Sequence, residues 1–256
     1  VELAAELSRL NAERRDEEER ILKEAVLQAE KQAGAGRMGL VLHSPGWHPG
    51  IIGIVASRVV ESLHRPTVVL STVDNFLKGS GRSVAGFDMH EAFSRCADLF
   101  LSFGGHKMAA GLSLPPEHLE IFRQRFDALV SGGLGDTPQE AECRIDCELD
   151  FSQADFHLLK ELEMLQPFGM GNAEPVFASP PVRVKTMRGR PGFMLLELED
   201  ESNGLTLAAK AWRHLADMPS SLKGKYIRIA YTPRIDRYNG AASIELRMKD
   251  WKEEEE

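Results

Sequence analysis

The first 32 residues carry apolar positions at helical spacing, but only towards the two ends of the stretch. Leu3, Leu7 and Leu10 share one face, and a second apolar stripe begins at Ile21. The residues between these stripes are charged on all sides, which is typical of a helix that bridges two bodies across solvent. No capping residue precedes Val1, so the helix is expected to start inside a longer element. We predict that residues 1–36 form a connecting helix.

From residue 37 to residue 135, short apolar runs alternate with amphipathic stretches. Runs at 38–42 and 67–70 predict two buried strands, and residues 50–63 between them predict a helix. Strand, helix and strand in this order indicate a βαβ unit. A helix capped by Asp88 and running to about residue 101, a strand over 108–114 and a helix from Pro115 and Pro116 to about residue 130 follow. The pattern predicts a small α/β domain, a mixed sheet with flanking helices.

A junction rich in glycine, aspartate and proline follows at 132–139. A strand is predicted over 143–149, and Ser152 with Asp155 predicts the start of a helix that runs to residue 165. After an irregular stretch, alternating apolar residues predict five short strands at 182–187, 193–198, 205–211, 226–231 and 243–248. Five such strands favour an OB-type β-barrel, with an SH3-like barrel as the alternative. Residues 136–256 are therefore expected to be a linker helix plus an OB-type nucleic-acid-binding domain.

The composition is that of a soluble globular protein. Of the 256 residues, 43% are hydrophobic and 27% are charged. No apolar run approaches the length of a membrane span, and the acidic N-terminus lacks the character of a signal peptide. The three cysteines have no zinc-like spacing. We expect a cytoplasmic protein with reduced cysteines and no contact with a membrane.

The net charge of −8 is unevenly distributed. Residues 180–250 hold 13 Lys and Arg against 8 Asp and Glu, a local charge of +5. Nucleic acids respond to such local stripes, and basic side chains beside aromatic ones are typical of sequence-tolerant single-strand binding. The predicted contacts in the barrel are Arg183, Lys185, Arg188, Arg228, Arg234 and Tyr238. The alternative for each of them is a solvated strand face.

Two glycine-rich segments of the α/β part are the main candidates for a binding site. Glycine lets a ligand approach the backbone and frees N–H groups for an anion, while hydroxyl, guanidinium and imidazole groups add donors. The residues predicted to bind phosphate are Ser80, Gly81, Arg82, Ser83, Gly104, Gly105 and His106. Two tight turns with purely structural glycines are the alternative. Trp47 is a candidate for stacking on a base, or else for packing at the start of a helix.

Five different short motifs follow one another along nearly the whole chain. They are WHPGIIGIVASR at 47–58, RPT at 65–67, GSGRS at 79–83, GGH at 104–106 followed by AAG at 109–111, and PFGMGN at 167–172. These segments resemble the RecJ family of single-strand-specific 5′→3′ DNA exonucleases, which belongs to the DHH class. The resemblance implies a DHHA1 domain followed by an OB-type domain, with the first helix as the connector from a preceding DHH catalytic domain.

The same resemblance implies roles for the glycine-rich segments. The serine, glycine and arginine that match the family pattern at 80–82 are implied to hold the 5′-terminal phosphate, and His106 is a candidate contact to the scissile phosphate. The catalytic Mn²⁺ or Mg²⁺ ions of the family are implied to sit on aspartates and histidines of the DHH domain, and this sequence has no Asp-His-His motif. Two-metal hydrolysis needs several such ligands. We therefore expect these 256 residues to bind no metal, to contain no catalytic residue and to be inactive alone.

The function implied by the resemblance is the substrate-binding half of an exonuclease of DNA repair and recombination. Its implied partners are single-stranded DNA with a 5′-phosphate end, the missing DHH domain and a single-strand-binding protein. An alternative function of a different class stays open. The chain could instead be a non-catalytic module with an OB domain that binds nucleic acid or docks a partner. A smaller oligoribonuclease of the DHH class is a third alternative, although it would lack the C-terminal barrel.

Overall fold

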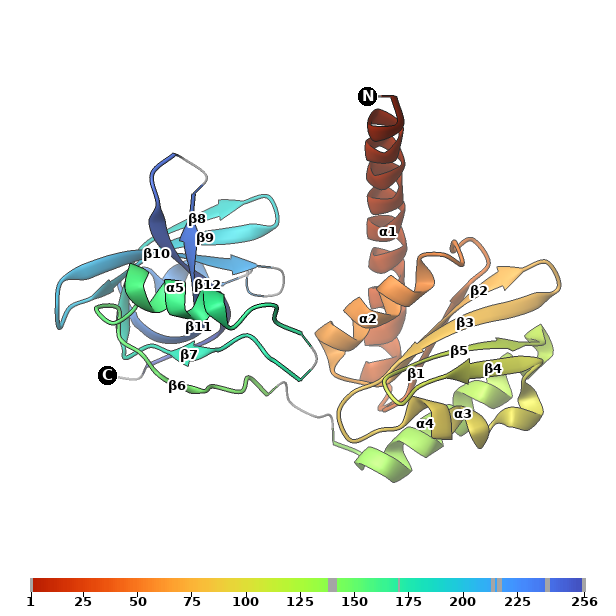
Figure 1. Cartoon of the computed structure of the whole chain (residues 1–256). Coiled ribbons are helices and arrows are strands. Elements are labelled where there is room, and N and C mark those ends of the chain that lie inside the picture. Colours follow the sequence, from red (N-terminus) through yellow and green to blue (C-terminus); the bar gives the residue numbers. More distant parts are fainter. Residues whose placement is uncertain are drawn as a thin grey trace. The chain divides into compact units, whose positions relative to one another are not determined.

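The computed structural model describes residues 2–137, 142–169, 171–212, 215, 218–237 and 240–254. The chain divides into two units, Val1–Ala141 and Glu142–Glu256. The first is coloured from red to light green in Figure 1, and the second from green to blue.

The first unit is organised around a five-stranded sheet, here called sheet 1, with the strand order β1-β2-β3-β5-β4. The strands are β1 (Leu40–Ser44), β2 (Thr67–Val73), β3 (Phe76–Arg82), β4 (Ser102–Gly105) and β5 (Ala109–Leu114). β1 and β2 are parallel and connected through α2 (Ile52–Leu63), which confirms the βαβ unit. The other neighbours are antiparallel, so sheet 1 is mixed as predicted.

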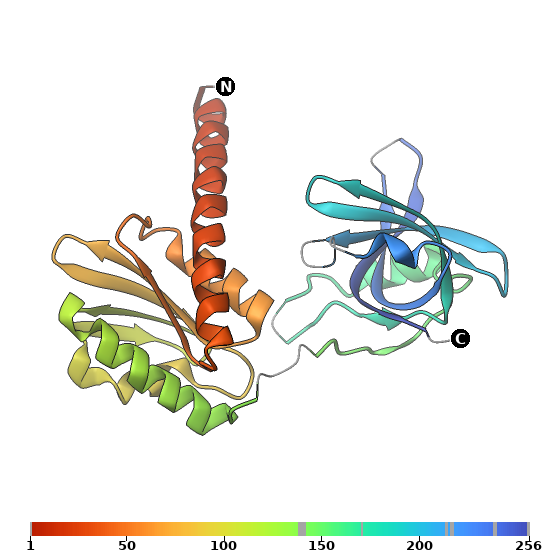
Figure 2. The same ribbon diagram turned by 180° about the vertical axis from the view of Figure 1, so that it is seen from behind.

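Helices pack on both faces of sheet 1 (Figure 1). On one face α1 (Glu2–Gly34) and α2 form an apolar core with β1 and β2, which includes Leu42, Val55 and Val69. On the other face α3 (Met89–Ser94) and α4 (Leu119–Leu134) form a second core with several phenylalanines. Figure 2 shows α4, in green, from the opposite side. Because both faces are covered at β1 and β2, each strand begins with a run of consecutive buried residues, Leu40–Leu42 in β1 and Thr67–Ser71 in β2.

Two glutamines of α1 close the outer edge of sheet 1. Gln28 donates to the His43 carbonyl (3.1 Å) and accepts from the His43 N–H (3.2 Å). Gln32 makes the same two contacts with Val41, at 2.9 and 3.2 Å. An edge strand presents unpaired backbone groups that can recruit another chain. The two side-chain amides therefore take the place of a further strand along β1.

The two glycine-rich segments are strands for most of their length. The first forms β3 in the middle of sheet 1, so the alternative of a tight turn is wrong there, and the second forms β4 and a short turn into β5. The helix capped by Asp88 begins as predicted, with the carboxylate accepting from the Glu91 N–H at 3.0 Å. It ends at Ser94, however, and a short 3-10 helix (Ala97–Leu99) follows.

In the second unit, five strands close into a ring in the order β8-β9-β10-β12-β11. They are β8 (Val182–Arg190), β9 (Phe193–Asp200), β10 (Leu205–Trp212), β11 (Tyr226–Asp236) and β12 (Ser243–Glu253). All five predicted strands are confirmed, and each extends further at its C-terminal end. β10 and β12 are parallel, and the other neighbouring strands are antiparallel. A closed ring of five strands is the OB-type architecture predicted from the sequence.

Tyr231 is a fully buried member of the barrel core. It is buried, its hydroxyl donates to the Leu149 carbonyl at 2.8 Å, and burial raises the pKa of its phenol. The strand predicted at 143–149 is reduced to the two residues of β6 (Cys147–Glu148), which pairs with β7 (Phe177–Ala178). β7 in turn pairs with β11, so this short pair extends the barrel sheet.

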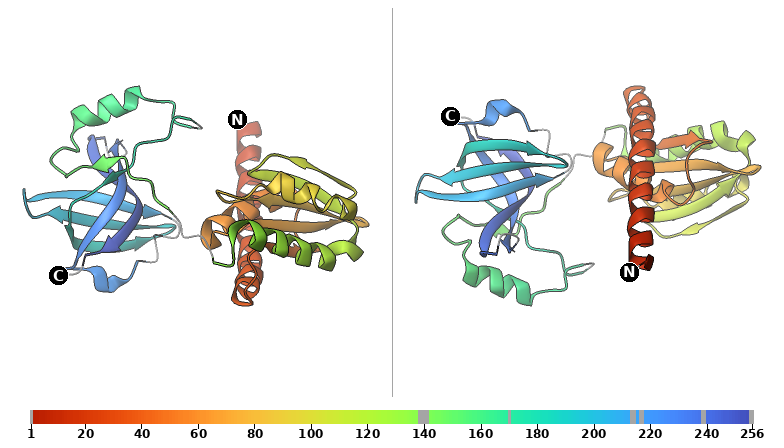
Figure 3. Two further views of the ribbon diagram at one scale, coloured as in Figure 1. Left: turned by 90° about the horizontal axis from the view of Figure 1, so that it is seen from below. Right: turned by 90° about the horizontal axis from the view of Figure 1, so that it is seen from above.

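One helix, α5 (Phe156–Met164), lies outside the ring of strands (Figure 3). Its cap is Asp155, whose carboxylate accepts from the Leu158 N–H at 2.8 Å. The predicted start at Ser152 is wrong, because the backbone N–H of Ser152 donates to Asp150 instead (2.9 Å). Asp150 thus closes a turn ahead of the helix.

Candidate nucleic-acid interface

The residues of β3 alternate between the two faces of sheet 1. Gly79 and Gly81 face the core on the side of α3 and α4. A Cβ atom on Gly81 would lie 2.9 Å from Phe93 Cζ, and one on Gly79 would lie 2.5 Å from Leu70 Cδ2. Close packing therefore explains both glycines. Since β3 has a neighbour on each side, its backbone groups serve the sheet, so the prediction that Gly81 binds phosphate is wrong.

The alternate residues of β3 point to the opposite face, beside α2. The register sets Ser80 beside Gly111 of β5, and Gly111 beside Gly104 of β4. Arg82 lies beside Ala109 in the next row. We call this surface the small-residue floor; it consists of Ser80, Arg82, Ser102, Gly104, Ala109, Gly111 and Ser113, none of which is buried. Apart from Arg82 these residues are no larger than serine, so a ligand can lie directly on the backbone. Lys78 of β3, beside Ser113, is the next cation on the same face.

Arg82 is the cation of the small-residue floor. Its Nε donates to Ser57 Oγ of α2 (3.2 Å), and its Nη1 donates to Ser80 Oγ and to the Gly81 carbonyl, both at 2.8 Å. The side chain is half-buried, and burial lowers the pKa of the guanidinium; an arginine still stays protonated at neutral pH. Within the described part of the chain, no carboxylate pairs with Arg82 and no protein group accepts from its Nη2. A guanidinium that is fixed by hydrogen bonds and still has one nitrogen without an acceptor can bind an anion.

The sequence analysis missed two residues of α2 that make room for this cation. A Cβ atom on Gly53 would lie 3.0 Å from Arg82 Nη2 and 3.2 Å from Ser80 Oγ. Ser57, one turn further along the same face of the helix, accepts from Arg82 Nε. The signal in the sequence was two small residues at a spacing of four, which places them on the same face of a helix.

Ser83 and His106 differ in their surroundings. Ser83 is buried and its hydroxyl donates to the Phe87 carbonyl at 2.8 Å, so the prediction that it binds phosphate is wrong. His106 is exposed in the turn between β4 and β5, where its N–H donates to the Ala109 carbonyl at 2.8 Å. Because Ala109 is also the neighbour of Arg82, the structure brings His106 and Arg82 to the same end of sheet 1.

The two glycines before His106 have different reasons to be glycine. Gly105 has a φ of +142°, and a Cβ atom there would lie 2.5 Å from the Ala109 carbonyl oxygen. The turn itself therefore requires glycine at this position. A Cβ atom on Gly104 would meet nothing within 4 Å. Packing does not explain Gly104, which leaves its open surface for a ligand.

Trp47 is only 2% exposed. Its Nε1 donates to Glu24 of α1 at 2.8 Å, and its carbonyl accepts from the hydroxyl of Ser71. The interpretation of Trp47 as a platform for a base is therefore wrong. The side chain packs the segment before α2 against α1, which is the alternative considered from the sequence.

Most of the cations predicted to form a basic stripe on the barrel have carboxylate partners. Arg183 lies 3.3 Å from Glu201, and Lys185 lies 2.9 Å from Glu199. Arg228 pairs with Glu148 and Glu254, and Arg234 pairs with Glu174. Among the described residues Arg188 has no such partner, and Tyr238 lies outside the described residues. The barrel therefore does not carry a continuous stripe of unpaired cations along these positions.

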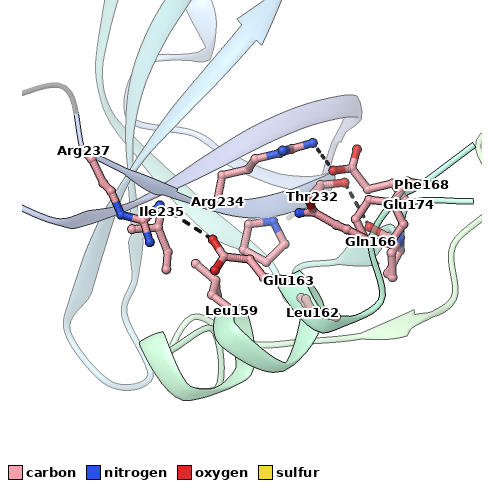
Figure 4. Close-up of a pocket in the computed structure, with 12 residues that line it drawn as sticks. Leu159, Leu162, Glu163, Gln166, Phe168, Glu174, Thr232, Arg234, Ile235 and Arg237 are labelled. Carbon is pink, nitrogen blue, oxygen red and sulfur yellow. Dashed lines mark hydrogen bonds and ion pairs between the residues drawn. The ribbon is translucent and has the colours of Figure 1, made fainter.

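A cleft of about 180 Å³ lies between α5 and β11 of the second unit (Figure 4). Leu159, Leu162 and Ile235 line its apolar part. Its two arginines face carboxylates, Arg234 that of Glu174 and Arg237 that of Glu163 at 3.8 Å. Paired in this way, the cations of the cleft attract phosphate less than Arg82 does.

Two further searches of the described residues gave negative results. No group of three or more His, Cys, Asp or Glu side chains is placed to hold a metal ion. None of the helices in the described ranges has the length and apolar character needed to cross a membrane.

Comparison with known proteins gives matches along nearly the whole chain. The family model of the DHHA1 domain matches residues 36–132, and that of the RecJ OB domain matches residues 145–250. The single-stranded-DNA-specific exonuclease RecJ of Bacillus subtilis is 36% identical over 176 residues, which are 68% of this chain and 22% of that protein. RecJ of Haemophilus influenzae is 29% identical over 256 residues, 96% of this chain and 44% of that protein.

A solved structure extends this likeness to the fold. The crystal structure of RecJ from Thermus thermophilus in complex with Mn²⁺ matches with a TM-score of 0.77 at 28% identity, over 99% of this chain and 36% of that one. The chain thus spans less than half the length of the relatives it matches. With a DHHA1 domain, a RecJ OB domain and the same fold, the chain belongs to the RecJ family and corresponds to the part that carries these two domains.

Proposed function

We propose that this chain is the substrate-binding part of a 5′→3′ exonuclease that degrades single-stranded DNA during repair and recombination. Its relatives are described as exonucleases specific for single-stranded DNA. In this proposal residues 1–36 connect to a catalytic DHH domain, residues 37–135 hold the 5′ end, and residues 136–256 bind the strand. A cytoplasmic location suits the three free cysteines, because thiols stay reduced there.

The observation that carries the proposal is the guanidinium of Arg82. It is held by two serine hydroxyls, lacks a carboxylate partner among the described residues and lies on a floor of small residues. A terminal phosphate carries about −1.5 to −2 charges at neutral pH, whereas a phosphodiester carries one. A single fixed guanidinium therefore favours the end of a strand over its interior, and that preference sets the direction of digestion.

The rest of the small-residue floor would position the first nucleotides. Ser80 Oγ would add a hydroxyl to the terminal phosphate, and Gly111 and Gly104 would let the sugar-phosphate chain lie on the backbone. His106, at the same end of sheet 1, is the candidate contact to the scissile phosphate. Gly105 contributes by forming the turn that presents His106.

The metal ions of the reaction do not fit the described residues of this chain. RecJ of Thermus thermophilus has been crystallised with Mn²⁺ and with Mg²⁺, yet no group of ligands for such an ion occurs in the described ranges. We therefore place the ions and the hydrolytic step in the DHH domain. The chain by itself is expected to bind DNA without cleaving it.

The test compares two oligothymidylates that carry a 3′ fluorophore and differ only at the 5′ end, phosphate or hydroxyl. Fluorescence anisotropy with the purified chain gives both affinities. A charge-assisted pair contributes about 1.5–3 kcal/mol, so the 5′-phosphate strand should bind roughly tenfold to hundredfold more tightly. Arg82→Ala should abolish the preference, and Arg82→Lys should keep part of it, because an ammonium cannot reproduce the planar fork.

Arg125→Ala is the matched control. It removes an arginine of the same unit that is already paired with Asp98, and it should leave the preference unchanged. Equal affinity of the wild-type chain for both strands would contradict the proposal and favour the non-catalytic binding module. A large fall in the melting temperature of Arg82→Ala, with both strands weakened alike, would show that Arg82 is structural.

A further inference from the structure

In the part of the chain that the structure describes, the guanidinium of Arg82 is held by neutral acceptors alone. Its Nε donates to Ser57 Oγ of α2 at 3.2 Å, and its Nη1 donates to a serine hydroxyl and to a backbone carbonyl, both at 2.8 Å. Arg58, the next residue of α2, pairs instead with the buried carboxylate of Glu18 at 2.7 Å. The fold thus neutralises Arg58 and leaves the charge of Arg82 uncompensated.

The hydroxyl of Ser57 has a fixed orientation, because it also bonds within its own helix. It donates its proton to the Gly53 carbonyl, one turn earlier, at 3.2 Å. A hydroxyl carries one proton and two lone pairs, so a lone pair of Ser57 Oγ stays free to accept from Arg82 Nε. This chain of two hydrogen bonds fixes the Nε side of the guanidinium to α2.

Gly53 determines how much space lies on the other side of the guanidinium. A Cβ atom at this position would lie 3.0 Å from Arg82 Nη2 and 3.8 Å from Arg82 Cζ. Gly53 lies within a regular helix, where alanine is the more favourable residue. The backbone conformation therefore does not require glycine here, and the missing side chain provides the free space beside Nη2.

The attachment of α2 to sheet 1 does not explain this arrangement. Apolar residues already bury one face of the helix, namely Ile52, Val55, Ala56 and Val59. A polar contact that only fastened α2 would be stronger with a carboxylate, because a charge-assisted hydrogen bond is roughly twice as strong as a neutral one. An anion site needs a cation that is held in place and still charged. Ser57 meets both requirements, whereas a carboxylate would meet only the first.

We propose that α2 sets the specificity of the 5′-end site. Ser57 positions the Arg82 guanidinium without neutralising it, and Gly53 keeps Nη2 open to the terminal phosphate. This inference rests on the proposed function and deepens it, because it assigns the selection of the 5′-phosphate to two residues outside the strand that carries Arg82. Both are positioning residues, since they act on the DNA through Arg82.

The test measures the ratio of the affinities for the 5′-phosphate and 5′-hydroxyl oligothymidylates by fluorescence anisotropy. Ser57→Asp and Ser57→Asn introduce side chains of nearly equal size that differ in charge. The aspartate should abolish the 5′-phosphate preference because it neutralises Arg82, whereas the asparagine, a neutral acceptor, should keep most of it. Equal losses in the two variants, or a preference that survives in Ser57→Asp, would overturn the proposal.

Uncharged variants of Ser57 separate positioning from folding. Ser57→Ala should lower the 5′-phosphate preference about twofold to tenfold, the effect of losing one neutral hydrogen bond. Ser57→Thr should restore it, because a threonine hydroxyl can also bond to the carbonyl one turn earlier. The matched control, Ser94→Ala, removes a hydroxyl that donates to the His90 carbonyl at 2.9 Å in another helix, and it should leave the preference unchanged. If Ser57→Ala lowers the melting temperature and leaves the preference intact, Ser57 is structural and the proposal is wrong.

Gly53→Ala tests the open side of the guanidinium. The added methyl group would crowd Arg82 Nη2, so it should lower the affinity for the 5′-phosphate strand and leave that for the 5′-hydroxyl strand unchanged. The matched control is Gly132→Ala in α4, where a Cβ atom meets nothing within 4 Å. It makes the same substitution in another helix of the unit and should leave both affinities unchanged. A preference that survives in Gly53→Ala would show that Nη2 needs no free space and would contradict the role proposed for Gly53.

The Nε proton of Arg82 gives a readout that is independent of DNA. In nitrogen–proton correlation spectra of the free chain this proton should exchange slowly with water, because Ser57 accepts it, and Ser57→Ala should make the exchange fast. If the wild-type chain prefers the 5′-phosphate strand and no variant of Ser57 or Gly53 changes that preference, the proposal is wrong and the proposed function stands. If the proton is protected but the wild-type chain shows no preference, the bond is only structural, and both the proposal and the proposed function are wrong.

Discussion

Alanine should have opposite effects at two adjacent glycines of β4. At Gly105 the φ of +142° and a contact of 2.5 Å between Cβ and the Ala109 oxygen oppose a side chain. The backbone conformation costs about 1–3 kcal/mol, and the overpacking adds about 1–3 kcal/mol. At Gly104 a Cβ atom meets nothing within 4 Å, and alanine is favoured over glycine in a strand by about 0.5–1 kcal/mol.

Thermal unfolding followed by circular dichroism measures the first consequence. A unit of this size loses about 2–4 °C per kcal/mol. The combined cost of about 2–6 kcal/mol for Gly105→Ala should therefore lower the melting temperature of the first unit by roughly 4–24 °C. Gly104→Ala should leave it unchanged or slightly raised. The methyl group of Gly104→Ala would stand on the small-residue floor beside Gly111 and hold the strand away from the backbone. We therefore expect it to weaken binding of the 5′-phosphorylated strand by about fivefold, close to 1 kcal/mol.

A control comes from Gly46, in the loop after β1, where a Cβ atom also meets nothing within 4 Å. Gly46→Ala should change neither the melting temperature nor the affinity. Gly104→Ala that destabilises as much as Gly105→Ala would refute the packing argument. Gly104→Ala that is stable and binds like wild type would show that the strand does not lie on the small-residue floor.

Two further predictions concern stability. Burial, with a smaller contribution from Arg123, lowers the pKa of His43, which shares a hydrogen bond of 3.1 Å with Thr72. The unfolded chain therefore takes up the proton more readily, and the stability that neutral His43 contributes should be lost as the pH falls below its unfolded pKa of about 6.5. The difference in urea unfolding between wild type and His43→Gln should vary in this range, and a constant difference would contradict the argument. Gln32→Leu leaves the N–H of Val41 without its partner, while the Val41 carbonyl still accepts from Arg123 Nε at 3.2 Å. The loss of the N–H partner should lower the free energy of unfolding by about 1–3 kcal/mol. Light scattering should detect association through the opened edge of β1, and a stable monomeric variant would show that the edge needs no such cover.

The strands of the barrel could be predicted from the sequence because their signal is local. Residues that face a core on one side alternate with residues that face solvent, and turn residues separate the strands. This pattern is present in β8 to β12, and all five were predicted. Only their length was underestimated, because most of the added residues at their C-terminal ends are polar; the exceptions include Trp212 of β10 and Trp251 of β12. The βαβ unit and the cap at Asp88 were predictable for the same reason.

The glycine-rich segments show where local information ends. A glycine can be required by a turn, by close packing or by a ligand, and the residue type is the same in each case. Phe93 packs over Gly81, the turn into β5 requires Gly105, and neither explanation applies to Gly104. The neighbours that distinguish these cases come from other elements, so no window of sequence around the glycines contains them.

The sequence by itself determined which kinds of side chain the protein has and where most of its strands and helices lie, although it did not predict β3 and β4. The tertiary structure decided which of these side chains remain exposed and unpaired, and so available to bind a ligand. Arg234 is paired with Glu174, 60 residues earlier, whereas Arg188 has no carboxylate partner in the described ranges. Trp47 is covered by α1, and Trp212 is exposed at the end of β10. Charge pairing and burial depend on which distant segments the closed barrel and sheet 1 bring together, and that distance along the chain is why the local pattern could not predict them.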